Sequence, residues 1–322
     1  MRKSMLAAVA AAAVLAPCVA TAQPYPNKPL RIIAAQSPGG ASDLFARVIG
    51  QKFSDAWKQP VVVENRAGAG GAIGTEYVAK SPPDGYTLLL AAAGQLVINQ
   101  SLYPKLGYDP VKDLAPAGFF ASSPLLLVTH PAVPIKSVKE LVAFGKGHPY
   151  GLNWGSGGSG SPAHLAAELF WAMTGTKMTH VPFKGVAPSV VAVIAGQVDL
   201  TFATIAATLQ QVRANRLRAL GVTTARRSQA MPEVPTIAEA GVPGYEMNTW
   251  YGLFAPAGTP RDIVQKLNAE IARIVNLPEV RDRLLGDGAD PGNLTLDQFA
   301  ALIRSDAARW AKVIKDAGVK AD

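Results

Sequence analysis

Short apolar runs rich in β-formers alternate with amphipathic stretches along most of this chain, and this alternation restricts its fold more than any other feature. Residues 30–34 and 87–91 have the pattern of strands, and residues 42–55 have that of a helix with Leu44, Val48 and Ile49 on one side. Strands that alternate with helices usually lie side by side in a parallel sheet. The pattern therefore predicts an α/β protein with a mostly parallel sheet.

The remaining elements follow from the same reasoning. Further strands are expected at residues 61–64, 125–129, 177–181, 200–203 and 219–223. Further helices are expected at residues 70–80, 137–145, 162–174, 187–196, 206–214, 261–275, 278–285 and 296–317. At 322 residues the chain can form two domains or one large one, and each can bury a core.

The first 22 residues have the organisation of a secretory signal peptide. Arg2 and Lys3 precede an apolar run at residues 5–15, and Ala22 ends a small-residue cleavage motif. The run is shorter than the roughly 20 residues of a membrane-spanning helix. We expect cleavage after Ala22 and a periplasmic location. An ordinary N-terminal helix and lipidation at Cys18 are the alternatives, the second disfavoured by Pro17.

Composition excludes several classes of protein. Only 17% of the residues are charged, and the apolar residues are spread among 30 glycines and 25 prolines, which argues against disorder and coiled coil. The formal charge of +8 drops by two on cleavage and still favours anionic partners. Since cleavage also removes the single cysteine, we expect neither a metal nor a cofactor. The chain has no basic stripe with interleaved aromatic residues, so we do not expect it to bind nucleic acid.

Two segments, residues 37–43 and 155–164, share one design: a strand, a glycine-rich turn and the start of a helix. Ser161 suits the N-cap of the second helix, Pro162 its first position, and His164 its first turn. Unpaired N–H groups at such a helix start bind a carboxylate or phosphate without an arginine. Each turn alone could also be a tight connection, but two of them favour an anion site.

Other functions find weaker support. Gly155, Gly157 and Gly160 match a dinucleotide fingerprint, but the acidic residue expected about 20 positions later is missing. The chain has no GxSxG or HExxH motif, so we expect a protein that is not an enzyme. Ser159 and His164 leave open the alternative of a secreted hydrolase.

Eight blocks of sequence resemble the substrate-binding proteins of tripartite tricarboxylate transporters, the Bug family, across essentially the whole mature chain. Among them are Pro38-Gly39-Gly40 with Asp43, Val63-Glu64-Asn65-Arg66, Pro83-Asp84-Gly85-Tyr86, Gly155-Ser156 with His164-Leu165, His180-Val181-Pro182-Phe183-Lys184-Gly185 and Trp250-Tyr251-Gly252.

The resemblance implies a type II periplasmic binding protein with two hinged lobes and a ligand cleft between them. Residues 23–121 would begin the first lobe, residues 122–249 would form the second, and residues 250–322 would complete the first. Such a protein captures a small carboxylate and delivers it to integral membrane permease subunits. We expect a monomer. A binding protein that serves a sensor kinase would look the same in sequence.

The resemblance also implies the site residues. Backbone groups of Gly39, Gly40, Ala41 and Ser42, with Ser37 and Asp43 in the same turn, would receive one end of the ligand. The second turn would hold the same carboxylate through Ser156, Gly158, Ser159 and His164. Candidates for the selective walls are Gln36, Gln95, Phe183, Thr204 and Trp250. Packing at the hinge is the alternative for Trp250, and a core position is the alternative for Phe183.

Departures from the family pattern bear on the ligand. Gln36 and Gln95 add amides, and Ala203 stands where an aspartate is frequent, which leaves no carboxylate to hold an ammonium group. We therefore expect an aromatic mono- or dicarboxylate such as terephthalate, or a di- or tricarboxylate.

Overall fold

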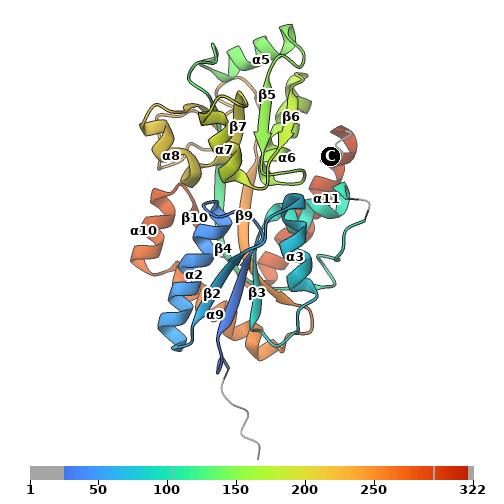
Figure 1. Ribbon diagram of the computed structural model, residues 1–322, viewed down its shortest axis with the longest axis vertical. Helices are drawn as coiled ribbons and strands as arrows, with labels where there is room; N and C mark the ends of the chain where they lie inside the picture. Colours follow the sequence, from blue (N-terminus) through green and yellow to red (C-terminus); the bar gives the residue numbers. More distant parts are fainter. Residues whose placement is uncertain (1–24, 104, 293, 318–322) are drawn as a thin grey trace, which may run out of the picture.

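Two β-sheets that share one long strand organise the molecule, a computed structural model that describes residues 25–103, 105–292 and 294–317 (Figure 1). The shared strand is β4 (Leu114–Thr129). The predicted signal peptide and Cys18 lie outside the described residues. Within the described part of the chain, every helix is too short or too polar to cross a bilayer.

The first sheet has the strand order β2-β1-β3-β9-β4. Its strands are β1 (Leu30–Ala34), β2 (Val61–Asn65), β3 (Thr87–Ala92) and β9 (Asn248–Pro256), and the short β10 (Asp290–Pro291) pairs with β4. β1 lies parallel to β2 and β3, whereas β9 is antiparallel to both β3 and β4. The run of leucines and alanines in β3 is buried along nearly its whole length, as a strand covered on both faces requires.

The second sheet begins where β4 changes partners. β4 pairs with β9 as far as Pro124. It then pairs with β7 (Leu200–Thr204) from Leu125 and with β8 (Arg218–Val222) from Leu126. Parallel to β7 lies β5 (Asn153–Ser156), followed by β6 (Thr179–Pro182). Because β4 and β9 run between the two halves, they are the natural hinge of a two-lobed α/β protein (Figure 1). The predicted lobe boundaries near residues 121 and 250 stay a prediction.

Helices cover both faces of each sheet. On the first lobe, α2 (Ala41–Trp57), α9 (Arg261–Val275) and α10 (Pro278–Gly286) share one apolar cluster. The other face holds α3 (Ala72–Ala79), the irregular segment η3 (Gly94–Ile98), α4 (Asn99–Leu102) and α11 (Leu296–Ala317). On the second lobe, α5 (Val138–Gly147) and α6 (Pro162–Thr174) cover one face, and α7 (Val186–Ile194) and α8 (Ile205–Arg213) the other.

Three expectations about the elements are wrong. The sheets are mixed rather than mostly parallel, because β4 and β9 run against their neighbours. β4 begins at Leu114 instead of residue 125, and the strand β9 was not expected. The helix expected from residue 70 begins at Ala72, since Gly70 and Gly71 adopt positive φ angles of 60° and 91° within a single 3-10 turn, η2 (Ala69–Gly71).

Candidate ligand-binding site

The first glycine-rich turn joins β1 to α2 and is shaped by its own side chains. Gly39 has a φ of 81°, a conformation that glycine adopts without strain, and its N–H donates to Asp43 Oδ2 at 3.0 Å. Ser42 Oγ donates to Gln36 Oε1 at 3.3 Å. The N-cap of α2 is Gly40, so no side chain caps this helix N-terminus. The positive end of a long helix therefore lies at the turn without a side-chain cap.

Asp43 is buried, and its ionised form is stabilised by the turn it supports. Burial alone would raise its pKa, but hydrogen bonds from Gly39 N–H and the Arg47 guanidinium outweigh burial and hold the pKa of the Asp43 carboxyl below its usual value. A carboxyl with a lowered pKa adds stability above its unfolded pKa of about 4 and loses it as the pH falls further.

We therefore expect Asp43→Asn to lower the free energy of unfolding at pH 7 by about 1–2 kcal/mol, because a charged acceptor is replaced by a neutral one. The difference from wild type should shrink when unfolding in urea is repeated below about pH 4. Asp55→Asn, an exposed change in the same helix, is the control. A difference that is the same at both pH values would contradict the role given to the carboxylate.

The second glycine-rich turn joins β5 to α6. Ser161 caps α6 as expected, accepting from His164 N–H at 3.3 Å. Ser156 Oγ accepts from Gly158 N–H at 3.0 Å, and His164 Nδ1 accepts from Gly160 N–H at 3.0 Å. Gly158 and Gly160 have φ angles of 103° and 81°. This turn, like the first, keeps its shape through side chains of its own strand and helix.

The two turns lie along one seam between the lobes. A Cβ added to Gly94 of the first lobe would lie 2.5 Å from the Gly160 carbonyl oxygen, and one on Gly70 would lie 2.1 Å from the Ser159 carbonyl oxygen. On the other side, a Cβ on Gly185 would lie 2.1 Å from Ser37 Oγ. Only glycine permits such close approach, so the structure has the lobes closed on each other.

Two buried hydroxyls along this seam lack hydrogen-bond partners among the described residues. Ser37 Oγ belongs to the first turn, and Thr204 Oγ1 lies where β7 ends and α8 begins, without capping the helix. Because β5 and β7 are parallel, Thr204 lies at the same sheet edge as Ser156 and the second turn. Ligands of open α/β sheets bind at this carboxyl edge. An unpaired buried hydroxyl is unfavourable, which suggests that a ligand supplies its partner.

Other predicted wall residues are engaged within the protein. Gln95 Oε1 accepts from Ala92 N–H at 2.8 Å, and its Nε2 donates to the Gly70 carbonyl at 2.7 Å. Trp250 Nε1 donates to Asp306 Oδ2 at 2.7 Å, and its ring packs edge-on against Phe299, contacts that favour a packing role. Phe183 is half-buried beside the second turn. Ala203 is buried in an apolar cluster with Val186 and Ile205.

The geometry gives no support to a serine–histidine pair. Both ring nitrogens of His164 have other neighbours: Nδ1 accepts from Gly160 N–H, and Nε2 lies 3.5 Å from Glu168 Oε1. Neither nitrogen is thus left to accept the Ser159 proton, which a nucleophilic serine requires. Among the described residues, no three His, Cys, Asp or Glu side chains gather into a group that could hold a metal ion.

Tyr103 is a seam residue that the sequence analysis missed. Its hydroxyl donates to the Ser159 carbonyl at 2.8 Å, which connects the segment after α4 in the first lobe to the second turn. Nothing local signals this contact, because the two residues are 56 positions apart.

Tyr103→Phe should therefore weaken ligand binding about fivefold, since one interlobe hydrogen bond contributes roughly 1 kcal/mol to the closed state. Because the bond forms on closing, we expect the dissociation rate to rise while the association rate is nearly unchanged, as measured by stopped-flow fluorescence. Tyr77→Phe, which removes a hydroxyl that accepts from Arg31 within the first lobe, is the control. A change confined to the association rate would argue against this role.

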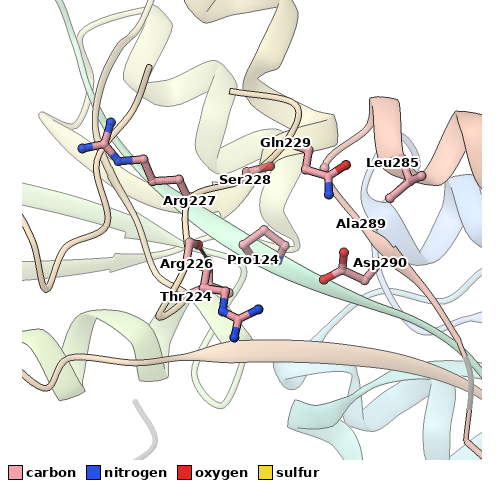
Figure 2. Close-up of a pocket in the computed structure, with 10 residues that line it drawn as sticks. Pro124, Thr224, Arg226, Arg227, Ser228, Gln229, Leu285, Ala289 and Asp290 are labelled. Atoms are coloured by element: carbon pink, nitrogen blue, oxygen red, sulfur yellow. Dashed lines mark hydrogen bonds between the residues drawn. The ribbon is translucent and has the colours of Figure 1, made fainter. Parts of the chain in front are cut away.

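A cavity of about 260 Å³ lies at the hinge (Figure 2). Its walls come from the loop after β8, with Arg226 and Gln229, and from the α10–β10 connection, with Asp290; Pro124 lies between them. Arg227 is turned away and pairs with Glu239 (Figure 2). The walls carry charges of both signs on exposed side chains, and the two glycine-rich turns do not contribute to them. This cavity is therefore a weaker candidate for a carboxylate site.

Solved structures with the same architecture define the class as two-lobed periplasmic binding proteins. One of them, the periplasmic binding protein BugD, matches with a TM-score of 0.87 and 31% identity, covering 92% of this chain and 99% of that one. The R. palustris protein Rpa4515, solved with adipate, matches with a TM-score of 0.89 and 37% identity, covering 92% of this chain and 99% of that one. MatC from Rhodopseudomonas palustris, solved with bound malate, matches with a TM-score of 0.86 and 33% identity, covering 90% of this chain and all of that one.

The sequence comparisons identify the family. The family described as "Tripartite tricarboxylate transporter family receptor" matches residues 45–319. Protein BugT of Bordetella pertussis is 38% identical over 97% of this chain and 95% of its own length. This chain belongs to the tripartite tricarboxylate transporter receptor family, as the resemblance in sequence indicates. The family is described as one of receptors, and its solved member BugD as a periplasmic binding protein.

Proposed function

We propose that this protein is an exported solute-binding protein that captures a small carboxylate between its lobes and delivers it to a tripartite tricarboxylate-type permease. The observation that carries the proposal is the seam, where the two glycine-rich turns contact the opposite lobe. The Ser37 hydroxyl in the seam and the Thr204 hydroxyl at the same sheet edge as the second turn have no partner among the described residues. Helix N-termini favour negative charge, and closing the lobes removes water from it.

The proposed site consists of the residues predicted in both turns and in the walls. Backbone groups of residues 39–42 receive the carboxylate, and the second turn meets it from the other lobe. The wall candidates Gln36, Gln95, Phe183, Thr204 and Trp250 carry no charge, so the rest of the ligand is neutral or is a second carboxylate held by amides and hydroxyls. Bound adipate and malate in two relatives agree with this class of ligand. An aromatic carboxylate such as terephthalate belongs to the same class.

The ligand is tested with the mature protein, residues 23–322, in a thermal-shift screen followed by calorimetry. The panel holds adipate, malate, citrate, terephthalate, benzoate, aspartate and glutamate. Binding of at least one carboxylate without an ammonium group is expected, one per protein, with stabilisation of about 2.7 kcal/mol at a hundredfold excess over Kd. Arg226→Ala, at the hinge cavity, should bind like wild type.

Each contrary result has a definite meaning. Tight binding of aspartate or glutamate alone would contradict the neutral wall, and loss of binding in Arg226→Ala would move the site to the hinge. Product formation during incubation would favour the secreted hydrolase. Uptake of the ligand by cells that carry or lack the permease genes separates a transporter component from a sensor component. The mass of the protein isolated from the periplasm tests cleavage after Ala22.

A further inference from the structure

Three aromatic rings pack together beside the second turn. Trp154 comes from β5, His180 from β6 and His164 from α6. The two imidazoles are parallel within 4° with centroids 4.6 Å apart, and Trp154 stacks on His180 at 4.2 Å. Trp154 and His164 are 1% and 3% exposed. We call these three residues the ring cluster.

Both imidazoles of the ring cluster are connected to the backbone of the second turn. His164 Nδ1 accepts directly from Gly160 N–H at 3.0 Å. His180 Nε2 lies 2.7 Å from Ser156 Oγ, which itself accepts from Gly158 N–H at 3.0 Å. The cluster thus determines the orientation of the two peptide groups whose glycines have positive φ.

The hydrogen bond from Gly160 N–H to His164 Nδ1 determines which ring nitrogen of His164 carries the proton. Since Nδ1 accepts a hydrogen bond from the Gly160 N–H, the ring carries its own proton on Nε2, which lies 3.5 Å from Glu168 Oε1. The ring is therefore occupied on both sides by the protein, and the stacked His180 covers its face. No polar atom of His164 remains for a ligand in the seam.

We propose that His164 and His180 are positioning residues, which hold the second turn in its ligand-binding shape without contacting the ligand. The inference rests on the proposed function only in that a ligand binds at the second turn. The bonds that hold the turn do not depend on that function. His180 thereby receives a role that the sequence did not predict. His164, predicted to contact the carboxylate directly, instead acts on the ligand through the shape of the turn.

Pairs of variants separate positioning from contact. In His164→Asn the amide oxygen lies near the place of Nδ1 and can accept from Gly160 N–H, whereas His164→Leu fills the space without an acceptor. In His180→Gln the amide replaces Nε2 toward Ser156, whereas His180→Leu removes it. Calorimetry with adipate and malate should give affinities within about threefold of wild type for the Asn and Gln variants and a loss of at least about tenfold for both Leu variants.

Amide hydrogen exchange at Gly160, measured by NMR without ligand, is the readout that does not depend on binding. Exchange should be slow in wild type and His164→Asn and faster in His164→Leu. Equal affinity losses in His164→Asn and His164→Leu, or unchanged exchange and affinity in His164→Leu, would overturn the proposal. If wild type binds no carboxylate, the proposed function fails, and the exchange rates still decide whether His164 holds the turn.

Discussion

Replacing Gly94 with alanine is expected to reduce carboxylate affinity by about 10- to 100-fold and to leave the ligand-free protein folded and nearly as stable as wild type. Gly94 starts η3 in the first lobe and does not have a positive φ, so alanine causes no backbone strain there. Its methyl group would lie 2.5 Å from the carbonyl oxygen of Gly160 in the second lobe. The clash therefore exists only when the lobes are closed, and it opposes closing rather than folding.

Gly286→Ala is the matched control for this change. Gly286 ends α10, and a Cβ added there has no heavy atom within 4 Å. Calorimetry should show the loss of affinity in Gly94→Ala alone. X-ray scattering should show that ligand compacts wild type and Gly286→Ala but not Gly94→Ala. Wild-type affinity in Gly94→Ala would mean that the ligand does not require the closed seam.

Removing the two seam hydroxyls should produce the second large effect, with opposite signs for binding and stability. Ser37→Ala and Thr204→Val should each weaken carboxylate binding about 10-fold or more, because a hydrogen bond to a charged group contributes roughly 1.5–3 kcal/mol. The ligand-free protein should be as stable as wild type or slightly more stable. Neither hydroxyl has a partner among the described residues, so an apolar replacement removes the penalty of burying an unpaired polar group.

Thr129→Val separates the ligand effect from the effect of burial. Thr129 Oγ1 is also buried without a described partner, but Thr129 pairs with Leu200 at the opposite end of β7 from Thr204. It should match Thr204→Val in thermal stability without ligand and bind like wild type. If Thr129→Val lost affinity equally, or if Thr204→Val were destabilised by 1 kcal/mol or more without ligand, the hydroxyl would have a structural function instead.

Helices with capping residues at their ends were predicted correctly from the sequence. The helix at Pro162–Thr174 has a serine cap, a proline at its first position and Gly175 after its end, and both bounds agree with the structure. The final helix, Leu296–Ala317, follows Thr295, which accepts from Gln298 N–H as its cap. The strand β9 and the first part of β4 escaped prediction because a hinge strand is defined by partners from distant segments.

Site residues also divide into those fixed by neighbouring residues and those fixed by distant contacts. Both glycine-rich turns were recognised from residue type alone, since a strand followed by glycines and a helix start limits the backbone within a few positions. The structural role of Gln95 could not be predicted from nearby residues, because its amide donates to the Gly70 carbonyl 25 positions earlier. The same holds for Trp250, whose partner Asp306 lies 56 positions later.

The amino-acid sequence alone was sufficient for the α/β class, the two glycine-rich turns before helix starts and the family, because capping, glycine conformations and motif spacing act over short stretches of chain. Tertiary structure decided that Gly94 meets Gly160, that Ser37 meets Gly185 and that His164 faces its own turn. Contacts across the seam depend on how two separately built lobes dock, and the free energy of docking depends on three-dimensional shape that no local pattern encodes.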